Sequence, residues 1–167
     1  MATLWLVGMM GAGKSTVGPL VAEGLGRPFV DLDEVIAAAA GRSIPAVFAA
    51  EGEAGFRRRE AAALEAAAGT EAVVACGGGI VVDPANVARL RQSGLVAWLA
   101  APAAVLAERV KDGAGRPLAG EGGSEVEARL AARERAYAAA SHCRVKTAGR
   151  SPEEVAEEVV RWWNASR

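Results

Sequence analysis

The sequence predicts an α/β fold in which a parallel sheet is covered by helices on both faces. Short apolar runs of strand length alternate along the chain with longer, alanine-rich, helix-forming segments. The runs are LWLV, PFVDLD, AVVAC, LVAWLA and CRVKT. This alternation is typical of βαβ units, because parallel strands must be joined by crossovers that helices supply. Glycine-rich segments directly after two of the runs are a further indication, since open α/β sheets bind ligands at their strand ends.

The length of 167 residues suits one domain with a substantial core. The 19 basic and 20 acidic residues give a formal net charge of −1, which predicts neither a nucleic-acid partner nor attraction to an anionic membrane. No apolar run reaches the roughly 18 residues that a membrane span needs. The start MATLWLVGMM also lacks the basic region of a signal peptide. We therefore expect a cytoplasmic protein, with Cys76 and Cys143 as reduced thiols.

The segment GMMGAGKST follows the first predicted strand and precedes a predicted helix. It matches the pattern G-x-x-x-x-G-K-[ST] through Gly8, Gly13, Lys14 and Ser15. Glycines here allow backbone N–H groups to wrap around a phosphate, and the helix presents its positive end to the same anion. Lys14 adds a positive charge, and the Ser15 hydroxyl can coordinate Mg²⁺. The segment predicts a nucleotide phosphate site, and the alternative is an ordinary strand-to-helix turn.

Two carboxylates close the second predicted strand, in VDLDE. Asp31 and Asp33 are two residues apart, so we expect their side chains on the same face of the strand. At the carboxyl end of a parallel strand they would lie beside the ligand, one in the shell of a magnesium ion and the other near an acceptor hydroxyl. The alternative for Asp33 is a helix cap, because the helical stretch EVIAAAA follows it.

A cluster of arginines in GEAGFRRRE offers a second anion site. Adjacent helical residues point about 100° apart, so the three arginines cannot all face one ligand and at least one is solvated. Arg57 and Glu60 are three residues apart and can pair on one helix face. Such a pair would hold the Arg57 guanidinium ready for a carboxylate or a phosphate. Ile44, Phe48 and Phe56 would supply an apolar wall nearby, and the alternative for each of them is a place in the core.

Two further segments are rich in glycine. ACGGGIVV has no lysine after its glycines, so it is not a second phosphate loop. Its place after a predicted central strand favours close backbone approach to a small acceptor, whose space a side chain at Gly78 or Gly79 would occupy. A flexible turn is the alternative. KDGAGRPLAGEGG, residues 111–123, carries the single arginine Arg116 and is a candidate mobile lid.

Taken together, these motifs resemble the shikimate kinase family. The resemblance rests on GMMGAGKST, DLDE, GRSIPAVFAAEGEAGFRRRE, CGGGI, GRPLAG, RERAY and GRSPEEV, which stand in the family's order and cover most of the chain. It implies one P-loop kinase domain over residues 1–167, with an acceptor-binding segment at about 33–62 and a lid at about 111–123. It also implies three layers around a five-stranded parallel sheet in the order 2-3-1-4-5. The implied reaction transfers the γ-phosphate of ATP to the 3-hydroxyl of shikimate, a step of aromatic amino-acid (chorismate) biosynthesis.

The resemblance also implies the roles of the site residues. Lys14, Asp33 and Arg116 would be catalytic, and the metal Mg²⁺ would be held by Ser15 and by Asp31, the latter through water. The residues implied to bind shikimate are Asp33, Arg57, Gly78, Gly79 and Arg133. The residues implied to bind ATP are Gly11, Ala12, Gly13, Lys14, Ser15, Thr16, Arg109, Arg116 and Arg150. Arg135 stands where the family commonly has proline, and it is a second guanidinium that could assist or replace Arg133.

Other functions of a P-loop protein are open to comparison. A gluconate kinase would share the P-loop but would not require FRRRE together with CGGGI. A nucleoside monophosphate kinase would need a base-reading pocket in place of carboxylate-binding arginines. An inactive nucleotide-binding module or an ATP sensor is disfavoured by the intact set Lys14, Ser15, Asp31, Asp33 and Arg116. We expect ATP and shikimate as the partners of a monomeric enzyme.

Overall fold

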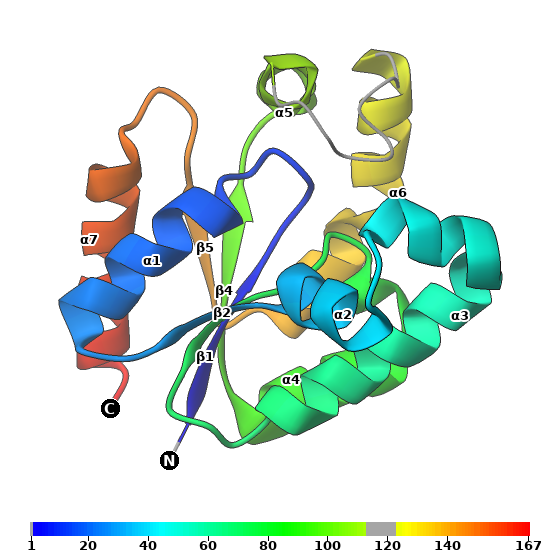
Figure 1. The fold of residues 1–167 in the computed structure, drawn as a ribbon. Coiled ribbons are helices and arrows are strands. Elements are labelled where there is room, and N and C mark those ends of the chain that lie inside the picture. Colours follow the sequence, from blue (N-terminus) through cyan, green and yellow to red (C-terminus); the bar gives the residue numbers. More distant parts are fainter. Residues whose placement is uncertain (1, 113–122) are drawn as a thin grey trace.

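The predicted parallel sheet is present in the computed structural model, which describes residues 2–112 and 123–167 (Figure 1). Its five strands pair in the order β2-β3-β1-β4-β5, and each neighbouring pair is parallel. The strands are β1 (Thr3–Val7), β2 (Phe29–Asp31), β3 (Val73–Ala75), β4 (Gly94–Ala100) and β5 (Cys143–Lys146). The α/β class and the strand order 2-3-1-4-5 are thereby confirmed.

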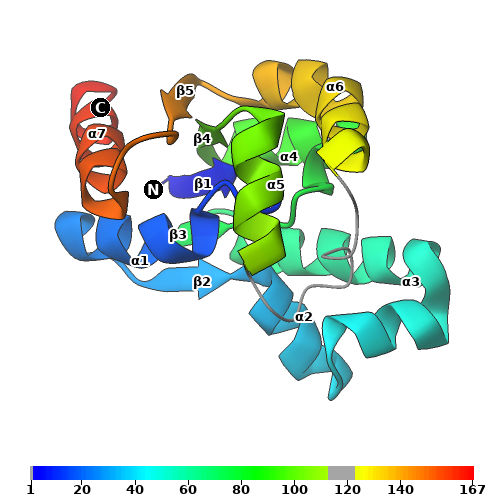
Figure 2. The same cartoon turned by 90° about the horizontal axis from the view of Figure 1, so that it is seen from above.

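Helices form a layer on each face of the sheet, which Figure 2 shows from above. α1 and α7 pack against each other on one face, whereas α4 packs against α3 and α6 on the other. α5 stands over the carboxyl ends of the strands, next to α6 (Figure 1). The helices are α1 (Lys14–Leu25), α2 (Leu32–Ala40), α3 (Ile44–Ala67), α4 (Pro84–Ser93), α5 (Ala103–Asp112), α6 (Gly123–Ala140) and α7 (Pro152–Ala165), with the short 3-10 helix η1 (Ile80–Val82).

Three strands end at the same level of the sheet. Leu6 in β1 pairs with Ala75 in β3, and Ala75 pairs with Asp31 in β2. The chain leaves β1 into the P-loop, β2 into α2, and β3 into the glycine loop, by which we mean residues 77–79. The register therefore brings these three segments to one edge, where open α/β sheets bind their ligands.

α2 and α3 extend away from this edge as a bent pair (Figure 1). No single helix within the described ranges is long and apolar enough to cross a membrane; α2 and α3 pass that test of length and composition only together, and they meet at 89°. Gly52 interrupts α3 with a φ of 69°, a conformation that favours glycine. Beside this break, Arg59 donates to both carboxylate oxygens of Glu51, over 2.9 and 2.7 Å. The break is thus braced by a bidentate ion pair.

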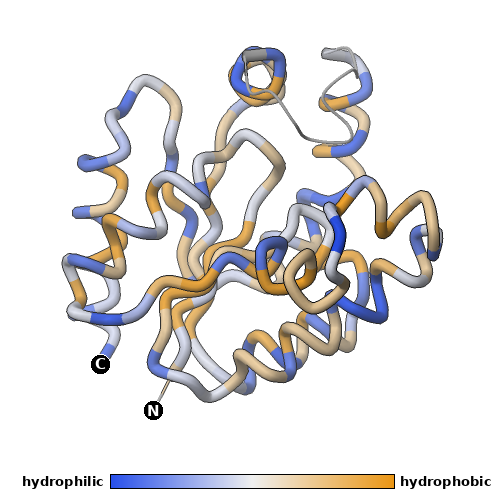
Figure 3. The backbone as a smooth tube through the Cα atoms, in the orientation of Figure 1, coloured by the Kyte–Doolittle hydropathy of each residue, from blue (hydrophilic) through white to orange (hydrophobic). Residues whose placement is uncertain are grey.

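The core lies along the sheet. Figure 3 shows the most hydrophobic backbone segments running through the strands, while hydrophilic residues are spread over the helices. Leu4, Trp5, Leu6 and Val7 in β1 have no exposed surface, as expected for a central strand that is covered on both faces. The apolar side chains of both helical layers join the same cluster, so one core supports the edge that carries the site.

A histidine extends the pairing of β4 with β5 by one step. The backbone N–H of His142 donates to the Val96 carbonyl over 2.8 Å, and the Val96 N–H donates to Nδ1 of His142 over 3.0 Å. The imidazole therefore acts as a hydrogen-bond acceptor, which requires its neutral form. Burial, helped by the charge of Arg91, lowers the pKa of His142.

Cys76 and Cys143 are free thiols, as predicted, and burial raises both their pKa values.

Candidate active site

A cleft of about 530 Å³ opens at the carboxyl edge of the sheet. This volume lies within the range of about 300–1,000 Å³ that small-molecule sites occupy. Four parts of the chain line it: the P-loop with the start of α1, the α2–α3 pair, the glycine loop, and α5 with α6. The lining residues are Met9, Met10, Ser15, Asp31, Asp33, Glu34, Ala37, Ser43, Ile44, Pro45, Phe48, Phe56, Arg57, Glu60, Gly77, Gly78, Gly79, Val110, Val126, Arg129 and Arg133.

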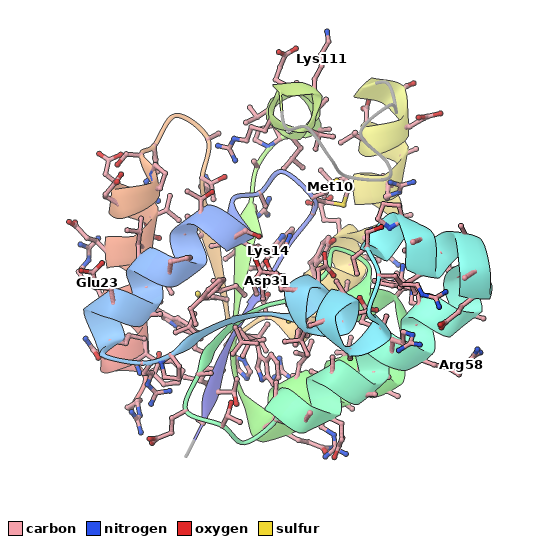
Figure 4. The ribbon with its side chains drawn as sticks, viewed as in Figure 1. Met10, Lys14, Glu23, Asp31, Arg58 and Lys111 are labelled. Atoms are coloured by element: carbon pink, nitrogen blue, oxygen red, sulfur yellow. The ribbon has the colours of Figure 1, made fainter. Side chains whose placement is uncertain are left out.

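The P-loop, residues 8–15, forms one end of this cleft. Gly8 has a φ of 147°, and a Cβ there would collide with the Leu99 carbonyl oxygen, so glycine is required. Lys14 is buried, and its ammonium donates to the carbonyls of Gly8 and Met9 over 2.6 and 2.9 Å. These bonds hold the positive charge beside the start of α1, whose N-terminal end favours an anion. Figure 4 shows Lys14 and Asp31 close together at the strand ends, with Met10 nearer α6.

Asp31 joins β2, α2 and the P-loop. Its Oδ1 accepts a hydrogen bond from the Asp33 N–H over 2.9 Å and so caps α2, while its Oδ2 accepts from the Ser15 hydroxyl over 2.8 Å. The expectation that Asp31 and Asp33 share one face of a strand is wrong, because β2 ends at Asp31 and Asp33 lies in the first turn of α2. The cap is Asp31, whereas the sequence suggested Asp33 for that role. Both carboxylates nonetheless line the cleft.

The predicted pair of Arg57 and Glu60 is present. Nη1 of Arg57 donates to Oε1 of Glu60 over 2.8 Å, and the Glu60 side chain is only 1% exposed. Burial raises the pKa of Glu60, and the adjacent Arg57 guanidinium opposes that rise. The aromatic rings of Phe48 and Phe56 stack with centroids 4.5 Å apart, next to Arg57, and form the predicted apolar wall. Arg58 is exposed and points away from the cleft, as one arginine of the three had to (Figure 4).

Two carboxylates converge beside the first glycine of the glycine loop. A Cβ built on Gly77 would lie 2.8 Å from Oε2 of Glu60 and 3.3 Å from Oδ1 of Asp33. The charge of Asp33 also raises the pKa of Glu60, although less than burial does. The loop backbone at Gly77 therefore has no room for a side chain, and Asp33 from α2 and Glu60 from α3 both line the cleft beside it.

The other two glycines of the loop face different partners. A Cβ on Gly79 would collide with the Arg57 guanidinium, whose Nη1 and Cζ would be 2.6 and 2.7 Å away. A Cβ on Gly78 would lie at ordinary contact distance, 3.4 Å from the Met10 nitrogen and 3.7 Å from Nη1 of Arg133. The nearest groups are therefore the arginines and the P-loop backbone, and the loop occupies the boundary between the two ends of the cleft.

α6 contributes cations from successive turns of one face. Arg133 lines the cleft, as does Arg129 one turn earlier. Arg135 is exposed and does not line the cleft, so of Arg133 and Arg135 the geometry favours Arg133 as a partner for Arg57 in the cleft. The sequence reading missed Arg129; a spacing of four residues from Arg133 was the available signal. It also missed that the Tyr137 hydroxyl donates to the Gly78 carbonyl, a contact across 59 residues of sequence.

The arginines expected on the nucleotide side are held by the backbone. Nη1 of Arg109 donates to the Gly11 carbonyl over 3.1 Å and to the Thr147 hydroxyl over 3.0 Å. Nη1 of Arg150 donates to the Lys146 carbonyl over 2.9 Å. Neither arginine is among the residues that line the cleft: Arg109 is held against the P-loop, beside the lining residues Met10 and Val110, and Arg150 follows β5. Arg116 and most of the segment 111–123, predicted as a lid, lie outside the described residues.

Comparison with known proteins agrees with these motifs. The sequence model of the family described as "Shikimate kinase" matches residues 10–164, most of the chain. The chain belongs to the shikimate kinase family. The shikimate kinase of Symbiobacterium thermophilum is 47% identical over 161 residues, covering 93% of this chain and 92% of that protein. The shikimate kinase of Salinibacter ruber is 46% identical, covering 94% of this chain and 82% of that protein. The predicted membership of a family of ATP-dependent kinases is confirmed.

Solved structures of shikimate kinases have the same fold. The shikimate kinase of Acinetobacter baumannii, solved in complex with shikimate, superposes with a TM-score of 0.94 at 33% identity, covering 100% of this chain and 95% of that chain. The shikimate kinase of Aquifex aeolicus gives a TM-score of 0.86 at 33% identity, with 98% and 97% of the chains covered. A gluconokinase from Sinorhizobium meliloti gives only 0.63 at 18% identity, over 99% and 93% of the chains, and shares the fold alone.

Proposed function

We propose that this member of the shikimate kinase family transfers the γ-phosphate of ATP to the 3-hydroxyl of shikimate, giving shikimate 3-phosphate and ADP. The observation that carries the proposal is one continuous cleft that joins a P-loop to an acceptor pocket with guanidinium groups from α3 and α6. Arg57 and Arg133 suit a carboxylate, which guanidinium groups bind through paired N–H donors. Phe48 and Phe56 suit the apolar face of a small ring.

Asp33 is the group proposed to act on the acceptor. It enters the cleft from the first turn of α2, two residues after Asp31, whose carboxylate accepts a hydrogen bond from Ser15 of the P-loop. Its carboxylate would accept a hydrogen bond from the acceptor hydroxyl and take its proton as the hydroxyl oxygen attacks the γ-phosphorus and ADP departs. Lys14 would neutralise charge on the phosphates. Phosphoryl transfer depends mostly on such positioning and charge neutralisation.

A magnesium ion fits the donors at the start of α1. The Ser15 hydroxyl and the Asp31 carboxylate lie 2.8 Å apart and both line the cleft, and oxygen donors of this kind are those that Mg²⁺ prefers. Within residues 2–112 and 123–167 no group of three His, Cys, Asp or Glu side chains is placed to bind a metal. The ion would therefore rely on Ser15, on Asp31 and on the nucleotide's own phosphates, and it would offset the phosphate charge.

A coupled assay of ADP release tests the proposal directly. The purified protein is offered ATP with magnesium and, separately, shikimate, gluconate or CMP. We expect the wild-type protein to turn over with shikimate and with neither of the other two acceptors. The variant Asp33→Asn, which keeps the size of the side chain but removes the base, should show almost no turnover with shikimate. Turnover with gluconate or CMP in place of shikimate, or Asp33→Asn close to wild type, would contradict the proposal. Sedimentation of the same sample tests the expected monomer.

A further inference from the structure

Tyr137 has a hydrogen bond that the proposed mechanism does not use. Its side chain has no exposed surface, and its hydroxyl donates to the carbonyl of Gly78 in the middle of the glycine loop. The ring stacks on Trp98 of β4, with centroids 5.6 Å apart, and Arg144 lies over the same tryptophan. Burial raises the pKa of Tyr137 to about 12, so the hydroxyl keeps its proton and remains a donor at neutral pH.

The partner of this hydroxyl is a short segment of three glycines. Its two flanks are held by backbone bonds: Cys76 donates to the Leu6 carbonyl over 3.0 Å, and Ile80 donates to the Gly77 carbonyl over 3.1 Å. Glycine has more backbone freedom than any other residue, so fixing the middle of such a loop needs a specific contact. The Tyr137 hydroxyl supplies that contact from α6, which packs on α4 and β4.

The same bond links two arginines of the acceptor pocket. Tyr137 follows Arg133 by four residues, one turn along α6, and the Arg133 charge is the strongest charge acting on the Tyr137 hydroxyl. Gly78, which Tyr137 holds, packs next to the Arg133 guanidinium, and Gly79 packs directly on the Arg57 guanidinium. One hydroxyl therefore ties the helix that carries Arg133 to the loop against which Arg57 rests.

We infer that Tyr137 is a positioning residue for the acceptor: by tying α6 to the glycine loop, its hydroxyl sets the spacing of the Arg57 and Arg133 guanidinium groups that receive the acceptor's carboxylate. The inference rests on the proposed function. A carboxylate bound between two guanidinium groups on different helices is sensitive to their spacing, because charge-assisted bonds weaken steeply with distance and angle. Tyr137 itself is not among the residues that line the cleft, so it acts through the arginines.

Tyr137→Phe removes the hydroxyl and leaves the ring, its volume and its stacking on Trp98. The matched control is Thr3→Val, which removes a buried hydroxyl that donates to the Thr70 carbonyl over 2.8 Å at the opposite end of β1.

The measurements are the dissociation constant of shikimate at equilibrium, kcat, the KM values of shikimate and ATP, and Tm. We expect Tyr137→Phe to weaken shikimate binding about fivefold, the usual worth of one hydrogen bond, and to change the ATP KM by less than about twofold. Thr3→Val should lower Tm similarly and leave both KM values unchanged.

A double-variant cycle with Arg133→Ala tests whether Tyr137 acts through the arginine. With Arg133 absent, the spacing of the pair no longer matters, so adding Tyr137→Phe should weaken shikimate binding by less than about twofold more. Additive losses would overturn the inference, as would unchanged shikimate binding in Tyr137→Phe, or equal losses in Thr3→Val. If the wild-type protein itself neither binds nor phosphorylates shikimate, the proposed function fails instead, and the two failures are thereby distinguished.

Discussion

Replacing Arg57 by alanine should destabilise the protein by leaving a buried carboxylate without its cation. Glu60 is 1% exposed, and its Oε1 lies 2.8 Å from Nη1 of Arg57. Breaking a buried ion pair by removing one partner costs about 3 to 5 kcal/mol. Because 27% of the Arg57 side chain is exposed, water already weakens this pair, and we expect the lower end, about 3 kcal/mol near pH 7.5. In a chain of this length that corresponds to a fall in Tm of about 6 to 12 °C.

The loss should depend on pH in a definite direction. Burial raises the pKa of Glu60 in the folded protein above its ordinary value of 4.5, and removing Arg57 raises it further. Between the unfolded pKa of 4.5 and the raised pKa of the folded variant, Glu60 is protonated in the folded state but ionised in the unfolded state. The destabilisation is therefore complete at a pH above the folded pKa, and it disappears as the pH falls below 4.5, where Glu60 is protonated in both states. Urea unfolding at about pH 7.5 and about pH 5 measures the difference.

A second substitution separates the buried charge from the lost arginine. Arg57→Ala combined with Glu60→Gln has no carboxylate at this position and should recover most of the stability near pH 7.5. It should not recover shikimate binding, because the guanidinium is still absent. The reasoning is refuted if the single variant loses the same stability at both pH values, or if the double variant is no more stable than the single one.

Three further outcomes are expected. Gly79→Ala should raise the shikimate KM about tenfold, because the alanine Cβ displaces the Arg57 guanidinium, and it should leave the ATP KM unchanged. Steady-state kinetics with each substrate varied in turn measure both constants, and an unchanged shikimate KM would contradict the prediction. The wild-type protein should lose stability as the pH falls from 6.5 through the lowered pKa of His142, since protonation removes the acceptor for the Val96 N–H; His142→Asn should show a flatter Tm–pH profile below pH 6.5. Ser15→Ala should reduce kcat at least about tenfold at saturating ATP and raise the magnesium concentration needed for half-maximal rate; an unchanged magnesium titration would remove Ser15 from the metal site.

Much of the fold followed from local sequence patterns. Alternating apolar and alanine-rich runs predicted the parallel sheet, and the P-loop pattern predicted where the first strand ends, since both signals depend on residues near one another in the chain. The end of β2 was predicted wrongly. Period-two alternation gives no sign of where a strand stops, and here the carboxylate of Asp31 starts α2 one residue later by capping the Asp33 N–H. An acidic first turn before an alanine run was the usable signal.

The site was predictable where its contacts are local. The pairing of Arg57 with Glu60 follows from their spacing on a helix, and it is present at 2.8 Å. The burial of Glu60, and the bond from Tyr137 to Gly78, depend on how distant segments pack, and no short-range pattern carries that information. The roles assigned to Asp33, Arg133 and the other site residues are still predictions, for which the variants above are the test.

The double use of Asp31 limits which residues could replace it during evolution or in the laboratory. Asparagine would keep an oxygen for the α2 cap but lose the charge near Ser15, whereas glutamate would keep the charge on a side chain poorly suited to the cap. Serine or threonine would cap but offer no carboxylate. We therefore expect a randomised library at this codon, selected for growth that depends on the enzyme, to return aspartate almost exclusively. Arg58 in α3, by contrast, is exposed and should accept many residues, so the tolerance of the gene to substitution would differ sharply between these two positions.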